Sequence, residues 1–203
     1  ITSAALIFLW VESKVNFNKA IPNSRNIYVG ALHYFSASGE CETYFETNNP
    51  LKKTLDDEFP EVKSCARYND ETLIFIPENT TSSFEEKGAY ADSTLFGMIG
   101  VKFLRGDMHS VFEPQQAVVL SRSMARKIYG EEDPIGKGLL NEGVIYQVTG
   151  VFEDMPRNTS FQFEWLIPFR VEELAQSKNF DLNGWGYSWL QTYVELQPGV
   201  DLN

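Results

Sequence analysis

Short runs of alternating hydrophobic and polar residues, separated by turn residues, recur along the whole chain. Alternation with a period of two is typical of strands that bury one face. On this basis we predict a hairpin formed by residues 26–36 and 41–47, and a second hairpin within residues 137–154. Further strands are predicted at residues 62–69, 71–78, 88–92, 117–121, 161–169 and 190–197.

Apolar positions spaced three or four residues apart predict a few short helices. Leu51, Leu55 and Phe59 share one face of a helix that would begin at Pro50, with Asn49 as its N-cap. Pro60 would end this helix, because proline cannot continue the backbone hydrogen bonds. Other short helices are predicted at residues 93–100 and shortly after residue 170.

The helix predicted at residues 122–129 has the most complete set of signals. Ser121 is expected to cap its start and Gly130 to end it. The apolar stripe formed by this helix is expected to pack on the hairpin at residues 138–151. The members of the stripe are Met124, Ala125, Ile128 and Tyr129.

The chain opens with an apolar run, Ala4–Val11, that has two interpretations. It is too short to cross a bilayer, which takes about 20 apolar residues. It is either an amphipathic helix that packs on this domain or the end of a transmembrane helix that continues upstream. Either helix would end near Asn18, before Pro22.

The order of the predicted elements indicates an α+β fold with mostly antiparallel strands. Strands at both ends of the chain flank a middle section that contains most of the helices. We therefore expect an outer unit, residues 26–91 together with 189–203, that carries an inserted small α/β unit, residues 92–188.

Charge and composition exclude several classes of function. The formal net charge of −11 would repel a phosphate backbone, so nucleic-acid binding is not expected. The chain has only two histidines, which leaves little material for a metal centre or a catalytic triad. Its two cysteines, Cys41 and Cys65, could form a disulfide or remain free thiols.

No convergent catalytic cluster is evident, and we expect neither an enzyme nor a cofactor-binding protein. The acidic runs at residues 56–58, 85–86 and 131–133 are local and typical of solvated surfaces. A ligand-binding sensor domain is the alternative, because Trp185, Tyr187 and Trp189 could line a groove.

The pair Gly136-Lys137 raises the question of a phosphate-binding loop. Such a loop has four residues between its glycines and a Ser or Thr after the lysine. Here five residues separate Gly130 from Gly136, and Gly138 follows the lysine. Three carboxylates at residues 131–133 would also repel a phosphate. We therefore expect no nucleotide binding at this stretch.

The same stretch carries a family resemblance. "AVVLSRSMARKIYGEEDPIGKGL" followed by "YQVTGVFEDMPRNTSFQFEWLIPF" resembles the extracytoplasmic core domain of MacB-type ABC transporter permeases, a group that includes FtsX-like permeases. It is most similar to the four-helix permeases of Bacteroidetes-type bacteria. The matching motif residues are Ser121, Ala125, Gly130, Asp133, Pro134, Gly136, Lys137, Gly150, Asp154, Pro156 and Asn158.

The resemblance implies a porter-like subdomain with an inserted small α/β subdomain, placed outside the inner (cytoplasmic) membrane. Residues 1–25 would then be the end of the first transmembrane helix and a juxtamembrane segment. The implied role is non-catalytic: the domain transmits motion from a cytoplasmic ATPase subunit. Further implied partners are a second permease copy and a periplasmic adaptor or exported substrate.

Overall fold

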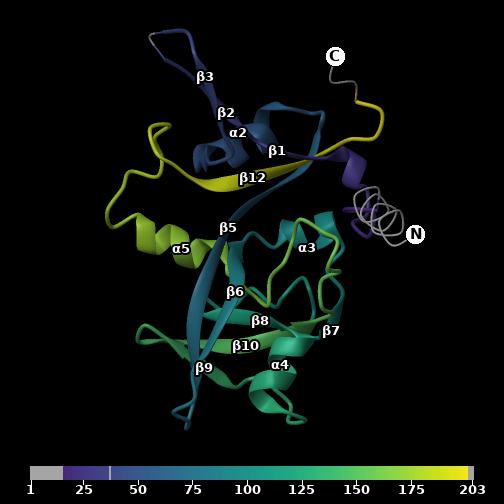
Figure 1. Cartoon of the computed structure of the whole chain (residues 1–203), viewed down its shortest axis with the longest axis vertical. Helices are drawn as coiled ribbons and strands as arrows, with labels where there is room; N and C mark the ends of the chain where they lie inside the picture. Colours follow the sequence, from purple (N-terminus) through teal and green to yellow (C-terminus); the bar gives the residue numbers. More distant parts are fainter. Residues whose placement is uncertain (1–15, 37, 201–203) are drawn as a thin grey trace, which may run out of the picture.

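A computed structural model describes residues 16–36 and 38–200, and its main feature is one continuous ten-stranded sheet (Figure 1). The strands are β1 (Ile27–Val29), β2 (Leu32–Phe35), β3 (Cys41–Tyr44), β4 (Thr47–Asn48), β5 (Val62–Pro77), β6 (Phe84–Ala91), β7 (Phe103–Arg105), β8 (Ala117–Ser121), β9 (Gly138–Asn141), β10 (Val144–Phe152), β11 (Trp165–Pro168) and β12 (Ser188–Leu196). The helices are η1 (Ser24–Asn26), α2 (Pro50–Glu58), α3 (Thr94–Ile99), α4 (Arg122–Tyr129) and α5 (Phe169–Gln176).

The sheet runs in the order β1-β12-β5-β6-β11-β8-β10-β7, with β4 beside β12 and β9 beside β10 and β5. Strands β8 and β10 are parallel, as are β6 and β11. The other strand pairs in the described part of the chain are antiparallel. The predicted α+β class with mostly antiparallel strands is confirmed.

Strand β5 corrects one prediction. Residues 62–69 and 71–78 are not two strands but parts of a single strand of 16 residues. The polar residues Asn69, Asp70 and Glu71 lie where the two predicted strands meet, yet they pair with Tyr90, Ala89 and Gly88 of β6. Pairing satisfies their backbone groups, so the polar side chains do not interrupt the strand.

The predicted strand 26–36 is also wrong as a single element. Gly30 lies at its break, and its amide donates to the carbonyl of Thr192 at 2.8 Å. Before the break, β1 pairs with β12; after it, β2 pairs with β3 in a separate two-stranded sheet. This β2–β3 hairpin projects from the top of the molecule in Figure 1.

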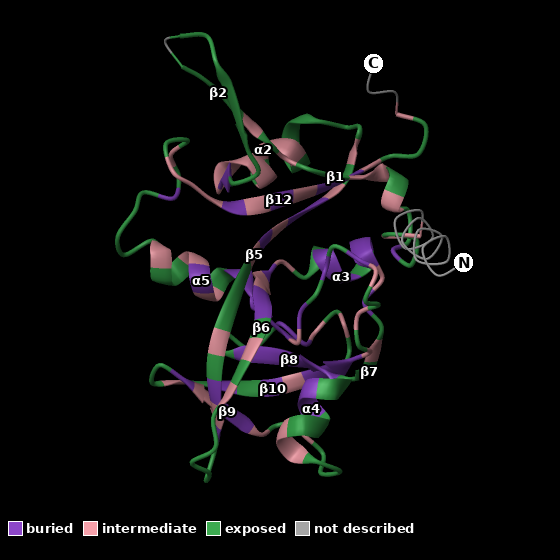
Figure 2. Cartoon of the chain, viewed as in Figure 1, coloured by how far each residue is buried: buried purple, intermediate pink, exposed green. Residues whose placement is uncertain are grey.

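Two hydrophobic cores lie on opposite faces of the sheet around β8. Ala117 and Val119 belong to the core that contains α3, whereas Val118 and Leu120 belong to the core that contains α4. Every residue of β8 is buried, as expected for a strand covered on both faces (Figure 2). This burial matches the uninterrupted apolar run of residues 117–120.

The end of the molecule around β12, β4 and α2 is packed more thinly. Helix α2 has no fully buried residue. Polar groups take part in the interior here: the hydroxyls of Thr47 and Thr192 lie 2.7 Å apart, and both residues are buried. We call this the β12 end of the molecule, and the opposite part around α4, β9 and β10 the α4 end.

The hairpin predicted within residues 137–154 is present as β9 and β10. Its turn places Glu142 at a φ of 46° and Gly143 at 83°. Positive φ at both central residues is the requirement of a type I′ turn, which matches the twist of the paired strands. Gly supplies this conformation without steric cost at the second position.

The apolar run at residues 4–11 lies outside the described residues. Among the helices of residues 16–36 and 38–200, none is long and apolar enough to cross a membrane. Cys41 is an exposed free thiol and Cys65 a buried one, so the structure contains no bridge between them.

Candidate functional site

The guanidinium group of Arg67 joins elements from distant parts of the chain. Its Nε and Nη2 donate to the two carboxylate oxygens of Asp92, each at 2.9 Å. Its Nη1 donates to Asn49 Oδ1 at 2.8 Å and to Glu173 Oε1 at 3.0 Å. The group lies over the ring of Phe169, 4.3 Å from its centroid. We call these five residues the Arg67 cluster.

The geometry of the cluster makes it a rigid connection. The side chains of Arg67 and Asp92 are 16% and 17% exposed, so solvent screens their attraction less than at an open surface. A two-point contact between guanidinium and carboxylate also fixes orientation, which a lysine could not do. The cluster therefore holds β5, the end of β6, α5 and the start of α2 in one arrangement.

Asn49 shows how the tertiary structure reassigns a local signal. It precedes Pro50 as predicted, but its side chain makes no capping hydrogen bond to α2. Its Nδ2 donates instead to Glu173 Oε1 at 2.8 Å. Asn49 thus occupies the predicted N-cap position, but the side-chain capping bond is absent because its side-chain amide is used by the Arg67 cluster.

Helix α5 is tied to β5 and to the loop before β8. Arg170 donates to the carbonyl of Pro114 at 2.7 Å and to that of Phe112 in the loop before β8. Two residues further along the helix, Glu172 accepts a hydrogen bond from Asn69 Nδ2 of β5 at 2.7 Å. Together with Glu173 in the Arg67 cluster, these contacts make α5 a strut between β5 and the loop before β8.

Glu172 is a buried carboxyl beside this strut. Its residue is 8% exposed, and its Oε2 has no hydrogen-bond partner in the described part of the chain. Burial raises the pKa of this carboxyl, and the hydrogen bond from Asn69 lowers it. The effect of burial is the larger one, so the pKa is about 7. The charged form is therefore destabilised in the folded state.

Replacing Glu172 by glutamine should change how stability depends on pH. Because the folded pKa is raised, the folded state keeps a proton that the unfolded state loses between about pH 4.3 and the folded pKa. The free energy of unfolding of the parent chain should thus fall as pH rises through this window. Glu172→Gln removes this loss and should be more stable than the parent at pH 8, by up to about 3 kcal/mol.

The measurement is urea denaturation at pH 5 and pH 8. Glu113→Gln, at an exposed position, is the control and should change stability little at either pH. A difference between Glu172→Gln and the parent that is the same at both pH values would contradict the assignment of the titrating group.

Aromatic rings form a column that ends at the Arg67 cluster. Phe180 stacks on Tyr187 at a centroid distance of 4.1 Å, and Tyr187 lies 6.2 Å from Trp189. Trp189 stacks on Phe169 at 5.4 Å. Two of the residues proposed to line a groove, Tyr187 and Trp189, thus pack against each other, whereas Trp185 is 57% exposed.

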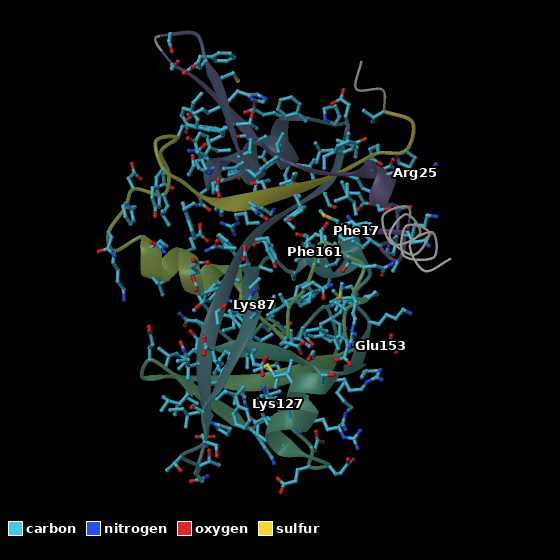
Figure 3. The ribbon with its side chains drawn as sticks, viewed as in Figure 1. Phe17, Arg25, Lys87, Lys127, Glu153 and Phe161 are labelled. Carbon is cyan, nitrogen blue, oxygen red and sulfur yellow. The ribbon has the colours of Figure 1, made fainter. Side chains whose placement is uncertain are left out.

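A second set of contacts holds residues 16–18, the first residues that the structure describes. Asn158 Nδ2 donates to the carbonyl of Asn16 at 3.0 Å, and the carbonyl of Asn158 accepts from the amide of Asn18 at 2.8 Å. The side chain of Asn18 pairs with Ser160 in both directions, at 2.9 and 2.7 Å. Figure 3 shows Phe17 and Phe161 in this region. We call these contacts the entry clamp.

Asn158→Ala should loosen the entry clamp without disturbing the cores. It removes one side-chain hydrogen bond, so the cost to stability should be about 1 kcal/mol. The amide of Asn18 should exchange its hydrogen faster in the variant, which hydrogen-exchange mass spectrometry measures. Asn183→Ala, at an exposed loop position, is the control. Unchanged exchange at Asn18 would show that the backbone bond alone holds the segment.

The other motif residues build the turn between α4 and β10. Ser121 Oγ accepts from the amide of Met124 at 2.9 Å and so caps α4 as predicted. Gly130 ends the helix at a φ of 65°. Ala125 lies in the α4 core with Met124, Leu139 and Val148. The predicted packing of this helix on the β9–β10 hairpin is present.

Several motif residues fix the backbone directly. The amide of Gly136 donates to the carbonyl of Val148 at 2.8 Å, and the carbonyl of Pro134 accepts from the amide of Lys137 at 3.1 Å. Asp154 accepts from the amide and the hydroxyl of Ser123 at 2.8 and 2.9 Å. The carbonyl of Pro156 accepts from Gln162 Nε2 at 2.8 Å.

Asp133 and Gly150 complete the motif. Asp133 accepts from the amide of Ile135 at 3.2 Å and pairs with Arg105 of β7 at 2.6 Å. Both contacts lower the pKa of the Asp133 carboxyl, and the hydrogen bond from the Ile135 amide has the larger effect. A Cβ at Gly150 would lie 3.0 to 3.1 Å from Val111, Phe103 and Val119, so the position requires a small residue.

Lys137 is occupied by contacts within the protein. Its ammonium group pairs with Glu132 and lies 4.9 Å from the ring centroid of Tyr129. It follows a helix end and precedes a strand, whereas the lysine of a phosphate loop stands at the start of a helix. Over residues 16–36 and 38–200, His, Cys, Asp and Glu form no group of three that could hold a metal ion.

Sequence reasoning missed the Arg67 cluster. Its members are separated by up to 124 positions, between Asn49 and Glu173, so no local spacing connects them. One signal was present: Arg67 is the single charged residue within the stretch "SCARY". A charge in a strand that is buried needs a partner, and Asp92 supplies it.

A family model described as "MacB-like periplasmic core domain" matches residues 1–203. A solved domain of a putative permease protein from Porphyromonas gingivalis is 28% identical, with a TM-score of 0.78. That match covers 89% of this chain and 77% of the other. No curated protein sequence matches the chain significantly.

Two more distant structures share the fold. The periplasmic region of MacB from Actinobacillus actinomycetemcomitans is 17% identical, has a TM-score of 0.63, and the match covers 91% of this chain and 79% of that one. The extracellular domain of the noncanonic ABC-type transporter YknZ from Gram-positive bacteria is 14% identical with a TM-score of 0.60. The match to it covers 86% of this chain and 85% of the other.

Proposed function

The chain belongs to the family of MacB-like periplasmic core domains, and from this membership we propose that it transmits ATP-driven motion across the periplasmic side of an ABC transporter permease. The permease context implies a cytoplasmic ATPase partner and a dimer. We also propose that the whole protein lies in the inner membrane and that it exports its substrate. The domain itself carries out no chemical reaction.

The observation that carries the proposal is the place of the Arg67 cluster. If the chain is divided as its sequence suggests, Asn49 and Arg67 lie in the outer unit, residues 26–91 and 189–203. Asp92, Phe169 and Glu173 lie in the inserted unit, residues 92–188. The cluster therefore crosses the boundary between the two units, which the strand pairs β5–β9 and β6–β11 also cross.

The entry clamp supplies the input to this connection. It joins residues 16–18, at the start of the described chain, to Asn158 and Ser160 of the inserted unit. A displacement of the segment formed by residues 1–25 would reach the inserted unit through these hydrogen bonds. The Arg67 cluster and the strut α5 would then pass it to the outer unit. We expect the two units to shift relative to one another as a result.

Distance measurements on the intact transporter test this function. Spin labels at Lys53→Cys on α2 and Glu131→Cys beyond α4 report the separation of the two units, in a Cys41→Ser background. Both positions are well exposed, with side chains 81% and 86% accessible. The permease and its ATPase subunit are placed in lipid nanodiscs, and pulsed electron paramagnetic resonance gives the distance distribution.

We expect the distribution to shift when ATP and magnesium are added. A complex with a hydrolysis-deficient ATPase should show a single shifted state, and a complex without nucleotide should show none. The proposal would be overturned if the active complex, the hydrolysis-deficient complex and the nucleotide-free complex gave identical distance distributions although the active complex hydrolyses ATP. A sensor domain would instead give a saturable change in tryptophan fluorescence with a small molecule and no response to ATP.

A further inference from the structure

The β2–β3 hairpin exposes more large apolar surface than its size explains. Phe35 is 74% exposed, and Tyr34, Tyr44 and Phe45 are also exposed. The hairpin forms its own two-stranded sheet and projects from the β12 end (Figure 2). Aromatic side chains gathered on one exposed element are typical of a surface that contacts another molecule.

The backbone of the hairpin is open for pairing. A sheet of two strands has an unpaired row of amides and carbonyls on each outer edge. Such a ribbon is only marginally stable by itself in water, so a third strand would stabilise it. Addition of an extended segment to an exposed edge is a common way of binding peptides.

The side chains define two faces for that segment. Pairing of Tyr34 with Glu42 and of Leu32 with Tyr44 places these four on one face. There the rings of Tyr34 and Tyr44 meet edge to face at 5.5 Å, and the hydroxyl of Tyr44 donates to Glu42 at 2.6 Å. The other face carries Phe35 opposite Cys41, with His33 opposite Thr43.

Charge selects the chemistry of the partner. Residues 26–51 contain Glu40, Glu42 and Glu46 but no lysine or arginine. An acidic aromatic surface complements a segment that alternates basic and apolar side chains. A second copy of this chain is a poor match, because each copy has a net charge of −11 and the two hairpins would bring six carboxylates together.

We propose that the β2–β3 hairpin binds an extended, basic and apolar segment of another periplasmic protein by adding it as a third strand. The proposal rests on the proposed function for placing that protein in the periplasm. The binding test for the hairpin uses neither ATP nor the ATPase. A negative result there would leave the distance measurements on the transporter unaffected, and a negative result in the distance measurements would leave the binding test unaffected.

The test measures binding of a fluorescein-labelled peptide of about eight residues that alternates lysine and valine. Fluorescence anisotropy should show saturable binding to the chain. A peptide of the same length with glutamate in place of lysine should not bind. A lysine–valine peptide with proline at its two central positions should bind about tenfold more weakly, because proline removes the amides that pair with the edge.

Two sets of variants localise the site. Combining Glu40→Gln, Glu42→Gln and Glu46→Gln should weaken binding about tenfold or more. The matched control combines Glu85→Gln, Glu113→Gln and Glu131→Gln, three exposed carboxylates elsewhere with the same total change in charge. Phe35→Ala with Phe45→Ala should also weaken binding, whereas Leu104→Ala with Leu174→Ala, also exposed, should not.

Cys41 gives an independent readout at the hairpin. It is exposed, whereas Cys65 is buried and burial raises the pKa of its thiol to about 12, so alkylation should select Cys41. Bound peptide should slow that alkylation. Circular dichroism melting checks that every variant is folded.

Three outcomes would overturn the proposal. Equal weakening by the hairpin variants and their controls would show general attraction to an acidic protein. Equal affinity for the proline peptide would exclude strand pairing. A hairpin-dependent dimer in sedimentation experiments, with Cys41 protected in the absence of peptide, would make a second copy the occupant.

Discussion

Replacing Gly88 by alanine is expected to cost about 3 kcal/mol or more of stability. A Cβ at this position would lie 2.1 and 2.3 Å from two atoms of the Trp165 indole and 2.4 Å from the carbonyl oxygen of Trp165. Trp165 is fully buried and sits beside Gly88 in the register of β6 and β11. Neither the ring nor the strand backbone has room to move.

The reason lies in how Trp165 is placed. Its indole lies across β6 where Gly88 has no side chain, and its Nε1 donates to the carbonyl of Glu86 at 2.8 Å. Phe75 and Tyr90 meet the ring edge to face, each at 5.6 Å. A methyl group at residue 88 would therefore displace the centre of the α4 core.

Gly97→Ala is the matched control for this prediction. Gly97 lies in α3, and a Cβ there would meet no atom within 4 Å. Alanine also favours the helix over glycine by about 1 kcal/mol, so this variant should be as stable as the parent or more stable. Thermal and urea unfolding compare the three proteins. A Gly88→Ala protein as stable as the parent would show that β6 and β11 separate easily.

Replacing Arg67 by alanine is expected to cost about 3–5 kcal/mol. The change leaves the carboxylates of Asp92 and Glu173, whose side chains are 17% and 34% exposed, without their cation, and it removes the packing on Phe169. Loss of one partner from a buried pair costs more than the pair contributes, because the remaining charge has lost both water and its counterion.

Arg67→Lys separates charge from geometry. Lysine keeps the positive charge but cannot make the two-point contact with Asp92 or donate to Asn49 at the same time. We expect it to recover part of the stability lost in Arg67→Ala. If the cluster transmits motion, the ATP-dependent distance change between the two units should be reduced in Arg67→Lys even where the protein is folded. A full distance change in that variant would assign the cluster to stability alone.

The region from β8 to β10 was largely predictable from sequence. The cap at Ser121, the helix end at Gly130 and the turn at Glu142-Gly143 each depend on contacts within a few residues. Signals of this kind depend only on residues close together in the sequence, and the tertiary packing agrees with them. The family motif added Asn158, whose contact with Asn16 no local pattern indicates.

The tertiary structure decided the elements whose polar residues find distant partners. Asn69, Asp70 and Glu71 continue β5 because β6 supplies their backbone hydrogen bonds. A sequence alone cannot show that a partner strand will be present, so these three polar residues predict two strands that meet there rather than one long strand.

The Arg67 cluster is the clearest case of what only the fold could decide. Sequence by itself determined most of the short elements, the cap at Ser121, the acidic surface and the family. It did not determine which partner Arg67 would find, because Asp92 and Glu173 come from positions 25 and 106 residues away. Long-range polar pairs form only after the strands and α5 have packed, when the cost of leaving a buried charge alone selects its neighbours.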